Sequence, residues 1–215
     1  MPTVLSTKKL TEIQQQLLLN SGLGWVHTDF ISTIPINFEF KETVSNAIFT
    51  SKNAVNSLLS KGIYIKNAFC VGMRTKQLLD EKKISVTLAG KNGETLGNEI
   101  LKQYPTTNFT YFCAVDRLDI LPNILAKENV KVKEVPVYKT LATPKKVNSH
   151  FDGVLFFSPS GVESFFKENE LKGQAFCIGN TTATAVQKYT TNYTIASKTT
   201  VENVLVTAIN YFKAL

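Results

Sequence analysis

The chain repeats part of its own sequence about 107 residues later. The segment AFCVG at 68–72 returns as AFCIG at 175–179. The same offset relates two further pairs of residues, Ser51 with Ser158 and Thr75 with Thr182. This period is too long for a solenoid, whose repeats span roughly 20–50 residues. We therefore interpret the chain as two duplicated halves of about 100 residues, the size of a small domain.

Within each half, short apolar runs alternate with helix-like segments. The run at 47–49 is followed by a polar turn and then by Val55 and Leu58 at helical spacing. The run at 153–157 is followed in the same way by Val162. Continuous apolar strands that alternate with helices are typical of parallel sheets covered on both faces. The predicted fold class is α/β, with two similar parallel-sheet domains of the flavodoxin-like type.

Two segments depart from this pattern and are expected to connect the domains. Residues 28–40 and 130–143 alternate between apolar and polar side chains, and each contains a proline, which is typical of half-exposed strands. We expect the two segments to pair as a two-stranded β-ladder linker. The expected organisation is a discontinuous domain of residues 1–31 and 144–215, a second domain of residues 38–133, and paired linker strands at 32–37 and 134–143.

Composition and charge exclude several classes of protein. The net charge is +7, but the lysines are scattered and no nucleic-acid-binding motif is present, so we expect a small polyanion as partner and no nucleic acid. No apolar run reaches the roughly 18 residues of a membrane span, and the first residues lack the pattern of a signal peptide. We expect a cytoplasmic monomer that does not bind membranes. The three cysteines lack metal-ligand spacing, which predicts buried thiols and no metal site.

Four predicted strand-to-helix turns, at 50–53, 72–75, 158–161 and 179–182, carry small hydroxyl or amide residues. Ligands of open parallel sheets bind beyond the carboxyl ends of the strands, and a helix N-terminus offers unpaired N–H groups to an anion. The same residues are also ordinary N-caps, so one such turn alone would be ambiguous. Four turns in two duplicated halves predict a cleft lined from both sides. Each turn is a candidate binding site for a carboxylate or a phosphate, and together the turns contain Ser51, Thr75, Ser158, Ser160, Gly161, Asn180, Thr181 and Thr182.

The sequence offers few catalytic groups. It contains no Ser-His-Asp or Cys-His arrangement, no phosphate-binding loop and no cluster of metal ligands. A chain with two ligand-binding halves and so few candidate acids and bases favours catalysis by positioning.

Four short blocks resemble the uroporphyrinogen-III synthase family, and their order and spacing cover nearly the whole chain. They are IFTSKNAV at 48–55, VYKT at 137–140, FFSPSGV at 156–162 and IGNTTA at 178–183. The resemblance implies two α/β domains joined by a two-stranded ladder. It also implies a cofactor-independent lyase that closes hydroxymethylbilane, a linear tetrapyrrole with eight carboxylates. The product ring carries an inverted ring D, and water is lost.

The resemblance also assigns roles to residues. It matches six hydroxyl residues to family cleft positions that would hold carboxylates: Ser51, Thr75, Ser158, Ser160, Thr181 and Thr182. It matches Tyr138 to the tyrosine that the family places at its cleft, where a phenol could protonate the departing hydroxyl. The alternative, that Tyr138 only packs in the linker strand, stays open. Arg117, near the end of a strand, is a further basic candidate.

Two other functions fit the same residues. A non-enzymatic, hinged two-domain protein that binds a small polyanion would have the same duplication and linkers. An isomerase or transferase acting on sugar phosphates would use similar turns.

Overall fold

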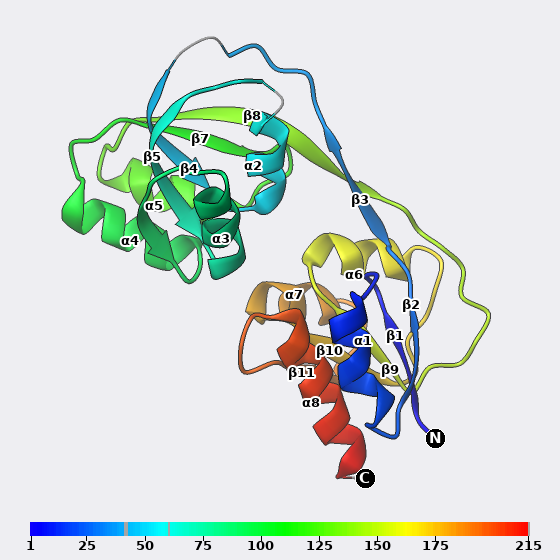
Figure 1. Ribbon diagram of the computed structural model, residues 1–215. Coiled ribbons are helices and arrows are strands. Elements are labelled where there is room, and N and C mark those ends of the chain that lie inside the picture. Colours follow the sequence, from blue (N-terminus) through cyan, green and yellow to red (C-terminus); the bar gives the residue numbers. More distant parts are fainter. Residues whose placement is uncertain (41–42, 60, 215) are drawn as a thin grey trace. The chain divides into compact units, whose positions relative to one another are not determined.

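The computed structural model describes residues 1–40, 43–59 and 61–214 (Figure 1). It divides into two compact units. Unit 1 consists of Met1–Ser32 and Leu141–Leu215, and unit 2 consists of Thr33–Thr140. Each unit contains a largely parallel sheet with its own helices and core.

The sheet of unit 1 has five strands in the order β11-β10-β9-β1-β2, and all neighbours are parallel. The strands are β1 (Thr3–Ser6), β2 (Gly24–His27), β9 (Gly153–Phe156), β10 (Gln174–Cys177) and β11 (Tyr193–Ile195). Numbered within the unit, this order is 2-1-3-4-5, the flavodoxin-like order.

Side chains that alternate along these strands build a core on each face of the sheet. Leu5 and Val154 pack with residues of α6 (Pro159–Phe166) and α7 (Asn180–Val186). Their neighbours Val4 and Leu155 pack with residues of α1 (Glu12–Leu19) and α8 (Val201–Lys213). Because both faces are covered, β9 is buried along its whole length, which explains its continuous apolar run.

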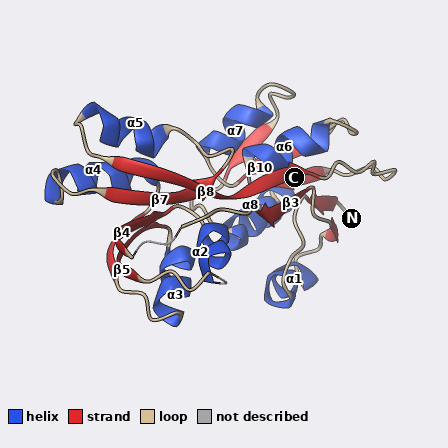
Figure 2. Ribbon diagram, turned by 90° about the horizontal axis from the view of Figure 1, so that it is seen from above, coloured by secondary structure: helices blue, strands red, loops and turns tan. Residues whose placement is uncertain are grey.

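The sheet of unit 2 has six strands in the order β3-β8-β7-β4-β5-β6, and the pairs from β8 to β6 are parallel. The strands are β3 (Ile31–Pro35), β4 (Val44–Phe49), β5 (Ile65–Val71), β6 (Val86–Gly90), β7 (Phe109–Ala114) and β8 (Val132–Ala142). Helices α2 (Lys52–Leu59) and α3 (Met73–Glu81) cover one face, and α4 (Gly93–Gln103) and α5 (Ile120–Lys127) cover the other (Figure 2).

The sequence repeat corresponds to a structural repeat. It matches β4 with β9 and β5 with β10, and the strand orders extend the match to β7 with β1. Under this matching, β8-β7-β4-β5-β6 has the same spatial order as β2-β1-β9-β10-β11. The two units are therefore circular permutations of one topology, because the matched strands of unit 2 begin, after β3, at the counterpart of β9. The predicted α/β fold with two similar parallel sheets is confirmed.

Strands β3 and β8 lie side by side and both pass from one unit into the other. Thr143 N–H donates to Phe30 O at 2.9 Å, and Ile36 N–H donates to Val137 O at 3.1 Å. The residue numbers rise from 30 to 36 on the β3 side while those of the bonded residues fall from 143 to 137 on the β8 side, so the pair is antiparallel. β8 also pairs with β7 from Val132 onward, so it is a sheet strand as well as a linker.

All three cysteines, Cys70, Cys113 and Cys177, are buried. Burial raises the pKa of the Cys70 and Cys113 thiols to about 11 and that of Cys177 to about 12, so all three stay protonated at neutral pH. Among the described residues, no helix combines the length and apolar character needed to cross a bilayer.

Candidate active site

The residues predicted to bind carboxylates lie where strands end and helices begin. In unit 2, Ser51 follows β4 and Thr75 lies in the first turn of α3, after β5. In unit 1, Ser158 follows β9 and Asn180 begins α7, after β10. Neighbouring strands are parallel, so these positions share the carboxyl edge of their own sheet. The structure thus groups Ser51 with Thr75 in one unit, and the residues at 158–161 and 180–182 in the other.

The turn before α6 combines two hydroxyls with a glycine. The Ser158 side chain caps the helix, since its Oγ accepts the Gly161 N–H at 3.1 Å. Thr7, the residue after β1, lies next to this turn and donates its hydroxyl proton to Leu155 O at 2.7 Å. A Cβ at Gly161 would lie 3.3 Å from Ser158 Oγ and 3.8 Å from Thr7 Oγ1. The Ser158 hydroxyl proton remains available for an anion, because the cap uses only an oxygen lone pair.

The matched helices α3 and α7 begin with a glycine at the N-cap. Gly72 and Gly179 occupy these positions, and among the described residues neither helix start has a side-chain capping hydrogen bond. Backbone N–H groups at such ends are suited to carboxylates. Asn180 and Thr181 are exposed beside them.

Two of the predicted hydroxyls are buried inside their units. Thr75 is 4% exposed and Thr182 is 1% exposed, and they are counterparts in the repeat. Both lie in the first turn of a helix, with the side chain directed toward the protein interior. Their side chains leave little surface for a substrate carboxylate.

Tyr138 lies beside Ser51 at the carboxyl edge of unit 2. It is 8% exposed and belongs to the core that also contains Phe49 and Val137. Burial raises the pKa of Tyr138, and a hydrogen bond with the Ser51 side chain opposes this shift only in part. The phenol is therefore protonated at neutral pH and able to donate. Ser51 Oγ also accepts the Asn53 N–H at 3.1 Å, which orients the serine.

A β-bulge places Tyr138 in this position. Cys113 on β7 pairs with Pro136, whereas the next residue of β7, Ala114, pairs with Tyr138. Val137 is thus the extra residue, and Val137 and Tyr138 are buried one after the other instead of alternating. Bulges redirect side chains in this way and are frequent next to active sites.

A second tyrosine lies one strand away, and the sequence contained no signal for it. Tyr111 on β7 is buried, and its Oη lies 2.9 Å from Thr50 Oγ1. Burial raises the pKa of Tyr111 to about 12. The pair joins β7 to the turn after β4, next to Ser51.

Arg117 is not a free positive charge. Its guanidinium contacts Glu134 on β8, with Nε 2.6 Å from Oε2, and also pairs with Asp119. The sequence could not reveal this arrangement, because Glu134 lies 17 residues farther along the chain.

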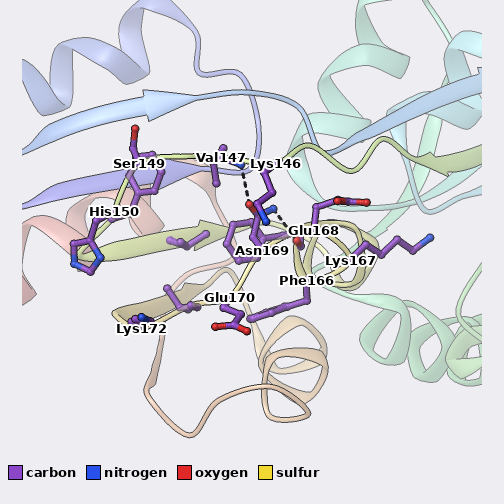
Figure 3. Close-up of a pocket in the computed structure, with 14 residues that line it drawn as sticks. Lys146, Val147, Ser149, His150, Phe166, Lys167, Glu168, Asn169, Glu170 and Lys172 are labelled. Carbon is purple, nitrogen blue, oxygen red and sulfur yellow. Dashed lines mark hydrogen bonds between the residues drawn. The ribbon is translucent and has the colours of Figure 1, made fainter.

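A separate cavity of about 660 Å³ lies in unit 1 at the C-terminal end of α6 (Figure 3). Ser158 caps the opposite end of this helix, so the cavity does not coincide with the predicted residues. Phe151, Val154 and Phe165 supply apolar surface, and Asn169 fixes one wall by accepting the Val147 N–H at 2.9 Å. The charged lining residues are of both signs and favour no single ligand: Lys146, Lys167, Glu168, Glu170 and Lys172.

Within the described part of the chain, no group of three His, Cys, Asp or Glu side chains is placed to hold a metal ion.

The fold and the site define a two-domain α/β protein whose parallel sheets present hydroxyl and N–H groups at their carboxyl edges, with a buried tyrosine at one of them. The family model described as "Uroporphyrinogen-III synthase HemD" matches residues 15–205. The chain therefore belongs to this family, and the family resemblance of the four sequence blocks is confirmed.

Known proteins support this assignment. The porphyrin biosynthesis protein HemD of Ruminiclostridium josui is 28% identical over 199 residues, which cover 85% of this chain and 37% of that protein. The chain thus spans little more than a third of the length of this curated relative.

Two solved structures share the fold. Uroporphyrinogen-III synthetase from Helicobacter pylori is 20% identical, with a TM-score of 0.75 over 98% of this chain and 100% of that chain. A mutant uroporphyrinogen III synthase from the extremely thermophilic bacterium Thermus thermophilus is 15% identical, with a TM-score of 0.66 over 100% and 99% of the two chains.

Proposed function

We propose that the chain is a uroporphyrinogen-III synthase, a cofactor-independent hydro-lyase of tetrapyrrole biosynthesis. In this proposal it cyclises hydroxymethylbilane with inversion of ring D and loss of water. The supporting observation is the pairing of Tyr138 with Ser51 at the carboxyl edge of unit 2, in a chain whose family match covers residues 15–205.

The helix starts hold the substrate carboxylates. Ser158, Ser160 and Thr181 donate hydroxyl protons to carboxylates, and the start of α7 at Asn180 offers backbone N–H groups. Gly161 gives its N–H to the Ser158 cap and places no side chain beside that hydroxyl, and Ser51 acts through its hydrogen bond with Tyr138. The net charge of +7 attracts a substrate with eight carboxylates. The buried Thr75 and Thr182 support the helix starts from inside each unit.

Tyr138 assists departure of the substrate hydroxyl. Its phenol donates a proton to the hydroxyl as the carbon–oxygen bond breaks, so that water leaves. Electrons of the adjacent pyrrole form a new bond to the carbon that lost the oxygen. The Ser51 hydroxyl then donates to the phenolate oxygen. The last pyrrole attacks through its substituted α-carbon, and the resulting spiro intermediate fragments and recloses with ring D inverted. The proton released from the ring D α-carbon at this closure returns to the phenolate and restores the phenol. The protein's main contribution is to hold the chain in the reactive conformer.

We also propose bounds for the two domains and a cellular setting for the protein. We place the domains at 1–31 with 144–215 and at 38–133, joined by strands at 32–37 and 134–143. The protein acts as a cytoplasmic monomer on a small molecule, without nucleic acid, membrane or metal.

The test is to incubate the purified protein with freshly prepared hydroxymethylbilane, to oxidise the products and to separate the porphyrin isomers. We expect isomer III in excess over the isomer I of the spontaneous reaction. Isomer I alone would refute the proposal. Binding of the substrate without isomer III would identify a binding protein, and thermal stabilisation by phosphate but not by uroporphyrinogen would favour a sugar-phosphate enzyme.

A further inference from the structure

The segment at 115–119, which follows β7, is attached to β8 on both sides of Tyr138. Val115 N–H donates to the Tyr138 carbonyl at 2.9 Å. Thr140 N–H donates to Asp116 Oδ1 at 3.3 Å. These bonds fix the backbone of β8 directly after the bulge at Val137, where the parallel register with β7 ends.

Arg117 adds a third attachment before the bulge. Its Nε donates to Glu134 Oε2 at 2.6 Å, and a second guanidinium nitrogen contacts the same carboxylate. A further guanidinium nitrogen pairs with Asp119 in its own segment. The planar fork of an arginine suits this arrangement, because one group engages two acids with fixed geometry. The segment therefore meets β8 at residues 134, 138 and 140 and spans the bulge.

The surroundings of Arg117 argue against direct binding of a substrate carboxylate. Its side chain is 22% exposed and lies between Glu134 and Asp119, whose two charges exceed its own. An anion approaching this group would meet net negative charge at close range.

We infer that Arg117 is a positioning residue for Tyr138: its ion pair with Glu134 anchors the segment at 115–119 on β8 and so keeps the bulge that directs the phenol toward Ser51. This inference rests on the proposed function, in which Tyr138 donates a proton to the substrate. Loss of the anchor frees the extra residue of the bulge, and the phenol then samples orientations that do not reach the leaving hydroxyl.

A double-mutant cycle between Arg117 and Tyr138 tests the inference. Arg117→Met is expected to lower kcat by about 10-fold, no more than Tyr138→Phe does, and to change KM by less than about 2-fold. In the Tyr138→Phe background, Arg117→Met is expected to have no further effect on kcat, because the residue acts through the phenol.

Two further variants complete the experiment. Glu134→Gln is expected to reproduce the loss of kcat, since it removes the carboxylate on β8 with which Arg117 pairs. Lys188→Met is the matched control, because it removes one positive charge from an exposed ion pair with Glu163 that lies in unit 1, beyond the C-terminal end of α7 and away from any helix start. It is expected to leave kcat and KM unchanged.

Different outcomes overturn different claims. A raised KM with unchanged kcat in both backgrounds would show that Arg117 binds the substrate. An equal loss of kcat in both backgrounds would show a general structural role. If the wild-type protein makes isomer III, either of these results refutes only the role inferred for Arg117. If the wild-type protein makes only isomer I, the proposed function is refuted. If Arg117→Met does not fold, Arg117→Lys keeps the charge, removes the fork and carries the same test.

Discussion

Replacement of Tyr138 by Phe separates the phenol's chemistry from its packing. The ring is 8% exposed within a core that also contains Phe49 and Val137, and Phe fills the same space. Only the hydroxyl and its hydrogen bond with Ser51 are lost. One such bond contributes about 1 kcal/mol to stability, so the variant is expected to fold normally.

The expected loss of rate follows from the environment of the phenol. General acids typically contribute about 10²–10⁴-fold to a rate, and they are most effective when their pKa lies near the working pH. Burial moves the pKa of Tyr138 upward, away from neutrality, which makes it a weaker acid. We therefore expect kcat to fall by about 10–100-fold, which corresponds to about 1.4–2.7 kcal/mol of activation free energy. KM is expected to change little, because the helix starts that bind carboxylates are untouched.

Isomer III formation under single-turnover conditions, measured across pH, is the appropriate assay. An acid acts only while protonated, so the wild-type rate is expected to fall as the pH rises through the raised pKa of Tyr138. This alkaline decline should be missing in the Phe variant. Complete loss of activity with the fold intact would refute the view that positioning dominates, and an unchanged rate would refute proton donation by Tyr138.

Two other predictions concern binding and stability. Ser158→Ala is expected to lower the free energy of unfolding by about 1 kcal/mol, because the helix cap is lost. It is expected to raise KM by less than about 3-fold, because the N–H groups of α6 remain. A large selective loss of activity would show that the hydroxyl itself is required. The free energy of unfolding in urea is expected to decline as the pH rises from about 9 to about 12. Burial raises the folded-state pKa of Cys177 from 9.0 to about 12 and that of Tyr111 from 10.0 to about 12. The contribution of these two groups to the free energy of unfolding is therefore complete below their unfolded-state pKa, and it is lost as the pH rises through their folded-state pKa. A constant free energy over this range would contradict the burial of these groups.

Local pattern predicted the architecture well. The apolar runs and the turn residues that follow them depend on neighbours within a few positions, so they identify strands and helix starts directly. The Ser158 cap and the helix start at Asn180 are of this kind. Parallel topology then follows from the alternation of strands and helices, since parallel neighbours need a crossover between them.

Side-chain surroundings could not be predicted in the same way. Thr75 and Thr182 have the residue type of ligand-binding positions, but in their helices these side chains face the interior. Arg117 has the residue type of an anion-binding group, yet Glu134 and Asp119 already neutralise it. Burial and pairing depend on what another element brings to the same place, and no local pattern records that.

By itself, the sequence determined that this protein is a duplicated α/β chain of the uroporphyrinogen-III synthase family with hydroxyl-bearing helix starts, because repeats, periodicity and caps can be read along the chain without knowing which distant residues meet. Only the tertiary structure decided that one half is a circular permutation of the other, and that a bulge in β8 sets Tyr138 beside Ser51. Both depend on the register and order of strands that are far apart in the chain, which are chosen by packing across the whole sheet.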